Sequence, residues 1–110
     1  MTDEYKVIYA PAALDDLRTI YSYIAYELMA EQAAENQTNR IRDRIRKLEY
    51  YPEKHKQVDW EPWASMRMRF MPVDRYVVYY SVNKTEMTVT VARIFHAGRD
   101  IERILREETE

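Results

Sequence analysis

One stretch, residues 66–99, limits the folds open to this chain more than any other. Apolar, β-branched and aromatic residues alternate with polar ones along it, and this period of two is typical of half-buried strands. Turn-forming residues at 72–74 and 83–85 divide it into three antiparallel strands. We expect this meander to be the platform of the protein, with helices over one face and basic residues on the other face or its rim. The predicted strands are 66–71, 75–82 and 86–96.

Two helices are predicted before the meander. Residues 5–10 read as a short strand that Pro11 stops, and apolar residues at helical spacing then favour a helix over 12–30 and a second over 31–50. No glycine or proline separates them, but a helical hairpin suits a chain of 110 residues better than one long helix. The stripes expected to be buried are Leu14, Leu17, Ile20 or Tyr21, Ile24 and Leu28, and Ala34, Thr38, Ile41, Ile45 and Leu48.

A polar connector over 52–65 and a short helix over 99–107 complete the chain. The connector holds Trp60 and Trp63, which either anchor it to the core or contact a partner; we favour anchoring. The element order βααβββα predicts an α+β fold with helices on one face of an antiparallel sheet.

Composition excludes several classes of function. The 110 residues suit one domain with a modest core. The absence of cysteine excludes disulfide and thiolate chemistry, and the single glycine excludes glycine-rich phosphate loops. Two distant histidines do not indicate a zinc site, and we expect no cofactor. No stretch reads as a signal peptide or a membrane span, so we expect a cytoplasmic protein.

Charge is unevenly distributed along the chain. Residues 1–39 hold two basic side chains against seven acidic ones, whereas residues 40–106 hold fifteen basic against nine acidic. The last four residues add three acids. The basic part indicates an anionic partner, either nucleic acid or an acidic protein segment, and the alternative is that these charges are solvated helix faces.

Four segments, taken in order, resemble one known family. Residues 5–17 read Tyr-Lys-Val-Ile-Tyr-Ala-Pro-Ala-Ala-Leu-Asp-Asp-Leu, and the helical hairpin that follows ends at Pro52. Residues 74–80 read Asp-Arg-Tyr-Val-Val-Tyr-Tyr, and residues 91–100 read Val-Ala-Arg-Ile-Phe-His-Ala-Gly-Arg-Asp before the terminal helix. Together they resemble the RelE/ParE superfamily of toxins from type II toxin–antitoxin modules, also called plasmid stabilisation proteins.

The resemblance implies a growth-inhibiting toxin domain over residues 1–110. A cognate antitoxin would neutralise it, in a toxin–antitoxin hetero-oligomer. RelE-like members cleave mRNA on the ribosome without a metal, and ParE-like members poison DNA gyrase without cleaving RNA. A third alternative is an inactive relative kept as a binding module.

The RelE-like mechanism requires phosphate binding and proton transfer. Arg75 and Arg99 stand where RelE-like toxins carry phosphate-binding arginines, and arginine suits this role because its planar fork stays charged. His96, at the end of the last predicted strand, is a candidate general acid or base. These three residues form the candidate catalytic set.

Each member of this set also has a structural interpretation. Arg75 would be a strand-edge arginine that deters aggregation or pairs with Asp74 or Glu86. His96 would be a satisfied histidine that ends the last strand. Arg99 would belong to the first turn of the terminal helix.

Four further basic residues are candidates for binding RNA or a partner. Lys54 and Lys56, with His55 between them, lie roughly where some members of the family keep basic catalytic residues. Arg67 and Arg69 alternate with apolar residues, so we expect them to project from the open face of the sheet toward antitoxin acids, RNA phosphates or solvent.

This chain departs from the RelE-like pattern at one position that bears on the choice between the two mechanisms. RelE-like nucleases often carry a tyrosine in the C-terminal helix, but no tyrosine follows Tyr80 in this chain. The long hairpin and the His-Ala-Gly-Arg-Asp segment look more ParE-like. Because the candidate set supplies phosphate-binding and proton-transfer groups, we place mRNA cleavage ahead of gyrase poisoning by a narrow margin.

Overall fold

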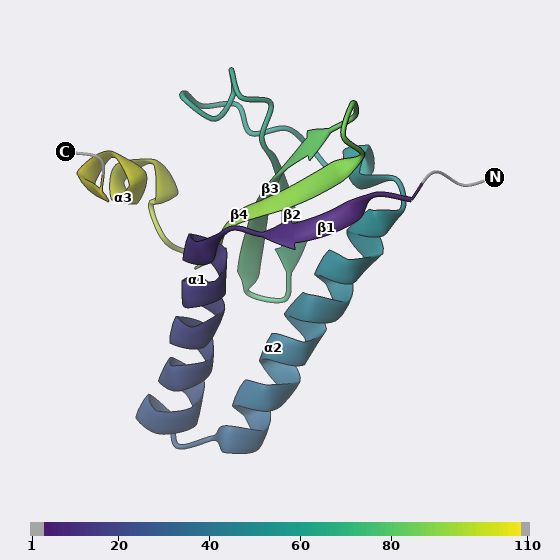
Figure 1. Ribbon diagram of the computed structural model, residues 1–110. Helices are drawn as coiled ribbons and strands as arrows, with labels where there is room; N and C mark the ends of the chain where they lie inside the picture. Colours follow the sequence, from purple (N-terminus) through teal and green to yellow (C-terminus); the bar gives the residue numbers. More distant parts are fainter. Residues whose placement is uncertain (1–3, 109–110) are drawn as a thin grey trace.

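The computed structural model of the protein describes residues 4–108, so both ends of the expected domain, 1–3 and 109–110, lie outside it. The expected order of elements is confirmed: an N-terminal strand, a helical hairpin, a three-stranded meander and a C-terminal helix (Figure 1). The strands are β1 (Lys6–Tyr9), β2 (Arg69–Val73), β3 (Tyr76–Asn83) and β4 (Thr88–His96). The helices are α1 (Pro11–Ser22), which continues as a π-helical turn (Tyr23–Glu27), α2 (Glu31–Arg46) and α3 (Ile101–Glu108), with short 3-10 turns at Lys47–Glu49 and Pro52–Lys54.

The four strands form one mixed sheet in the order β1-β4-β3-β2. The meander β2-β3-β4 is antiparallel, and β1 pairs in parallel with β4. The register places Tyr76 opposite His96, and a bulge between β3 and β4 leaves Ala92 without a partner residue. The last strand of the chain therefore lies in the interior of the sheet.

The helical hairpin covers one face of this sheet and projects beyond its edge (Figure 1). Every residue expected on the buried stripe of the second helix is buried, from Ala34 to Leu48. Thr38 is buried among them because its hydroxyl donates to the carbonyl of Ala34 at 3.0 Å. The buried core on this face comprises Ala13, Leu17, Ile20, Ile41, Ile45, Leu48, Met71, Val73, Val78, Tyr80, Val89, Val91 and Ile94.

The opposite face of the sheet is not open, which corrects our expectation of an exposed basic face. The connector and α3 fold over it and enclose a second, smaller core. Trp63 is buried in this core, stacks on Trp60 at 5.1 Å between ring centroids and packs against Tyr79 at 4.9 Å. The tryptophans therefore anchor the connector, as expected. The buried members are Val58, Trp63, Met68, Tyr79, Phe95 and Ile101.

The first helix differs from its prediction at both ends. The strand ends before Pro11, as expected, but the helix begins at Pro11 rather than at residue 12, because a missing N–H costs nothing at the first helical position. The first turn of α1 therefore holds no acidic residue, and both Asp15 and Asp16 lie beyond it. The regular helix ends at Ser22, and a left-handed residue, Met29 with φ 51°, separates it from α2. Leu14 and Leu28, expected to be buried, are exposed.

The meander strands are shifted relative to their predicted bounds. β2 begins at Arg69 rather than 66 and includes Pro72, which an edge strand tolerates because its missing N–H faces outward. The tight turn is therefore Asp74-Arg75, with Asp74 at φ 56°. Arg75 lies in this turn and not at the head of a strand.

Candidate functional site

Two members of the candidate catalytic set, His96 and Arg99, line one hollow of about 440 Å³. His96 ends β4; its ring meets the ring of Tyr76 edge-on at 5.5 Å, and its Nδ1 accepts the N–H of Gly98 at 3.2 Å. The guanidinium of Arg99 lies 5.6 Å from the ring centre of Phe95. The other lining residues are Asp16, Thr19, Ile20, Tyr23, Tyr76, Ile94 and Phe95.

Arg75 lies beside this hollow without lining it. Its carbonyl accepts the N–H of Ala97 at 2.8 Å, so the turn and the chain after His96 run next to each other. The structure thus brings two of the three residues into one hollow and places the third on the neighbouring turn.

Asp74 is not the ion-pair partner of Arg75. It accepts hydrogen bonds from Arg40 at 2.8 Å and from Gln37 at 2.9 Å, which hold the pKa of its carboxyl below the usual value. Among residues 4–108, neither Arg75 nor Arg99 makes an ion pair, so both guanidinium groups are available to a partner.

Arg69 does not project from an open face, contrary to our expectation. Its side chain is 16% exposed, donates to the carbonyls of Glu53 at 2.9 Å and His55 at 2.6 Å, and lies 3.8 Å from the Glu53 carboxylate. It therefore fastens the connector to β2. The other candidate binding residues are exposed: Lys54 and Lys56 on the connector, and Arg67, which has φ 57°, just before β2.

His55 lies among the basic residues of the connector. Partial burial lowers the pKa of its imidazole, and the positive charges of Lys54, Arg44 and Arg69 lower that pKa further. The region therefore carries positive charge even when the imidazole of His55 is neutral.

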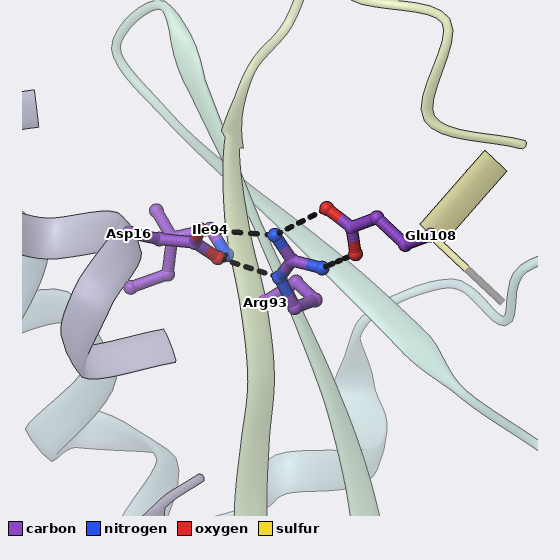
Figure 2. A network of polar contacts seen from close by, with 4 residues as sticks. All are labelled: Asp16, Arg93, Ile94 and Glu108. Atoms are coloured by element: carbon purple, nitrogen blue, oxygen red, sulfur yellow. Dashed lines mark hydrogen bonds and ion pairs between the residues drawn. The ribbon is translucent and has the colours of Figure 1, made fainter. Parts of the chain in front are cut away.

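Arg93, to which no sequence pattern assigns a role, is the centre of a polar network (Figure 2). Its guanidinium donates to Asp16 at 2.8 and 3.1 Å and to Glu108 at 2.6 Å, and it lies 4.4 Å from the ring centre of Phe95. Asp16 also accepts the N–H of Ile94 at 2.9 Å and raises the pKa of Arg93. An arginine inside an apolar strand already indicates a buried acidic partner, but the sequence does not show which acidic residue that partner is.

The end of the helical hairpin carries the largest group of exposed apolar side chains in the described part of the chain. We call Tyr23, Tyr26, Leu28 and Met29 the hairpin tip. Tyr26 is 68% exposed and Met29 is 88% exposed. They remain exposed because the hairpin extends past the sheet that buries its other end (Figure 1). Clustered apolar surface of this kind is typical of protein–protein contact sites.

Residues 4–108 contain neither a metal-binding cluster nor a membrane-spanning helix. No group of three or more histidine, aspartate or glutamate side chains is placed there to hold a metal ion. None of the helices in the same range combines the length and apolar character that a bilayer crossing requires.

Comparison with known proteins finds one family model, described as the ParE toxin of type II toxin–antitoxin system parDE, which matches residues 7–101. No curated protein matches the chain.

Several solved structures share the fold at low sequence identity. The chain is similar to one in the chromosomal ParDE toxin–antitoxin system of P. aeruginosa, at 15% identity and a TM-score of 0.70 over 86% of this chain and 98% of that one. It is also similar to a chain in the archaeal RelE–RelB complex of Pyrococcus horikoshii, at 19% identity and a TM-score of 0.61 over 90% of this chain and 99% of that one. The isolated E. coli RelE toxin is similar at 14% identity and a TM-score of 0.56, over 96% of this chain and 99% of that one.

Proposed function

Because the chain belongs to the ParE toxin family of type II toxin–antitoxin systems, we propose that it arrests growth by binding a protein target without cleaving RNA. The target that the ParE-like resemblance implies is DNA gyrase. The observation that carries this proposal is the hairpin tip, where apolar side chains stand clear of both cores. Large exposed apolar side chains are removed from water only when a partner covers them, so their presence favours a binding role.

The state of the other arginines supports the same proposal. Arg69 and Arg93 are both largely buried and bonded to the protein's own carbonyl or carboxylate groups. Aromatic side chains fill the face of the sheet between the connector and α3, around Trp63 and Phe95. An RNA phosphate entering there would have to displace packed side chains and break ion pairs, which costs several kcal/mol.

The hairpin tip is tested with a double variant, Tyr26→Ser with Met29→Ser. Purified wild-type toxin should inhibit supercoiling by DNA gyrase, and the double variant should need at least about tenfold more protein for the same inhibition. Met66→Ser, at another exposed methionine, is the matched control and should act like wild type. Full inhibition by the double variant, or none by the wild type, would rule out this proposal.

The second candidate function is ribosome-dependent mRNA cleavage, which one observation favours. His96 and Arg99 line the same hollow, and Arg75, on the adjoining turn, makes no ion pair within residues 4–108. An arginine can hold a phosphate there while a histidine moves a proton.

RNA profiling in cells separates the two functions. Under the gyrase proposal, messages stay intact during growth arrest, and His96→Ala arrests growth as wild type does. Cuts within translated codons that disappear in His96→Ala would establish cleavage instead.

The cognate antitoxin belongs to the same proposal. The similar P. aeruginosa and Pyrococcus horikoshii chains were solved in a ParDE system and a RelE–RelB complex. We expect a short protein encoded beside this gene to restore growth when the two are expressed together, and to elute with the toxin as a hetero-oligomer. Unrelieved growth arrest in that co-expression would argue against it.

A further inference from the structure

The hollow between α1 and the end of β4 combines apolar walls with a cationic rim. Ile20, Ile94 and Phe95, with the rings of Tyr23 and Tyr76, form most of its lining. Its volume of about 440 Å³ lies within the range of roughly 300–1,000 Å³ seen for ligand pockets. A bulky apolar side chain therefore fits it better than a solvated ion does.

The charges around the hollow do not cancel one another. Asp16 is the acid in its lining, and its carboxylate is already bonded to Arg93 and to the N–H of Ile94. Arg99 has no acidic partner among residues 4–108 and rests on the ring of Phe95. Arg75, on the adjoining turn, likewise makes no ion pair with any described residue. The rim therefore attracts carboxylates.

We infer that this hollow takes an aromatic side chain from an acidic segment of the antitoxin. The ring fills the apolar space, and carboxylates on either side of it in the segment reach Arg99 and Arg75. This inference rests on the proposed neutralisation by an antitoxin. It assigns to that partner a surface that shares Tyr23 with the hairpin tip but leaves Tyr26, Leu28 and Met29 to the target, so these three side chains affect toxicity and not neutralisation.

The probe is the peptide acetyl-Glu-Asp-Phe-Leu-Asp-Glu-amide, added to nitrogen-15-labelled toxin and followed by NMR. Gly98 is the one glycine of the chain, and its amide bonds to His96 at the rim, which makes it a distinct reporter. We expect its signal and that of Thr19 to shift in a saturable way. Peptides with alanine for phenylalanine, or lysine for the acids, should not shift them. Absence of a shift with the first peptide, or equal shifts with the lysine peptide, would overturn the inference.

Thr19→Trp fills the hollow, since Thr19 is an exposed residue of its lining. It should weaken peptide binding at least about tenfold. Its neighbour Arg18 lines a different depression, between α1 and α2, so Arg18→Trp should bind like wild type. Arg99→Gln, with Arg103→Gln as its control on α3, repeats the test without adding bulk. Unchanged binding by both Thr19→Trp and Arg99→Gln would overturn the inference.

Growth assays keep this test apart from that of the proposed function. Thr19→Trp should still arrest growth, but the protein encoded beside the gene should no longer restore it. A Thr19→Trp toxin that is harmless, yet still binds the peptide, would assign the hollow to the target and overturn the inference. If the Tyr26 and Met29 double variant remains toxic, the proposed mechanism fails while the peptide result stands.

Discussion

At the scale of single residues, identical side chains have different roles because their partners lie far away in the chain. Arg93 meets Asp16, 77 positions earlier, and Arg69 meets the carbonyl of His55, 14 positions earlier. Arg75 and Arg99 have no acidic partner within the described residues. Burial of a guanidinium requires such partners, whereas exposure requires none, so the first two arginines hold the fold together and the other two can serve a ligand.

His55 gives a residue-scale prediction for pH dependence. Its pKa is lowered from the ordinary value of 6.5, so the unfolded chain binds more protons than the folded protein just below that pH. His55 therefore makes its full contribution to the free energy of unfolding above about pH 6.5, and this contribution declines as the pH falls toward the folded-state pKa. Urea unfolding at about pH 7.5 and about pH 5.5 measures it. His55→Gln should lose less stability than wild type over this range, and an equal loss would contradict the prediction.

At the scale of elements, one polar network joins α1, β4 and α3 (Figure 2). Asp16 connects α1 to β4 through both Arg93 and the N–H of Ile94, and Glu108 connects α3 to the same guanidinium. Asp16 and Arg93 are about equally shielded, at 14% and 15% exposure, but the Glu108 side chain is 50% exposed. The first connection should therefore contribute more to stability than the second.

Alanine substitution at each acid tests this difference. Asp16→Ala should lower the free energy of unfolding by about 2–3 kcal/mol, because it leaves a shielded arginine and a backbone N–H without their acceptor. Glu108→Ala should cost less than about 1 kcal/mol but speed amide exchange in α3. Asp15→Ala, which removes only an exposed pair with Arg18, is the control. Equal losses for Asp16 and Glu108 would refute the ranking.

At the scale of the whole molecule, the sheet separates two cores of unequal size. The hairpin side buries the larger cluster, and the connector side buries the smaller one around Trp63. β3 contributes side chains to both cores, since Tyr80 belongs to the larger core and its neighbour Tyr79 to the smaller one. Tyr80 also donates its hydroxyl to the carbonyl of Pro52, which ties the start of the connector to the larger core. We therefore expect the two sides to unfold together.

Trp63→Ala tests this coupling. Removal of the buried indole should lower the free energy of unfolding by about 3–5 kcal/mol, and Trp63→Phe should cost less. Far-UV circular dichroism and tyrosine fluorescence should still report one shared urea transition. Loss of the tertiary signal at a lower urea concentration than the secondary signal would show that the smaller core unfolds alone.

The order of elements, the hairpin and the three strands follow from local patterns, because periodicity and proline placement act within a few residues. The buried stripe of the second helix was predictable in full, but that of the first was not: Leu14 of α1 is exposed, and Leu28, also exposed, lies beyond the end of the helix. The strand bounds shifted because a left-handed Asp74 made the turn and Pro72 stayed at an open edge.

What sequence patterns could not supply are the contacts that depend on distant pairing. The parallel addition of β1 to β4, the second core and the Asp16–Arg93 pair all arise once the chain closes on itself. The same holds for the site: His96 and Arg99 are close along the chain, but Thr19, Ile20 and Tyr23 of α1 complete their hollow. Local preferences select the elements, whereas burial and charge pairing between them determine which side chains remain free to act.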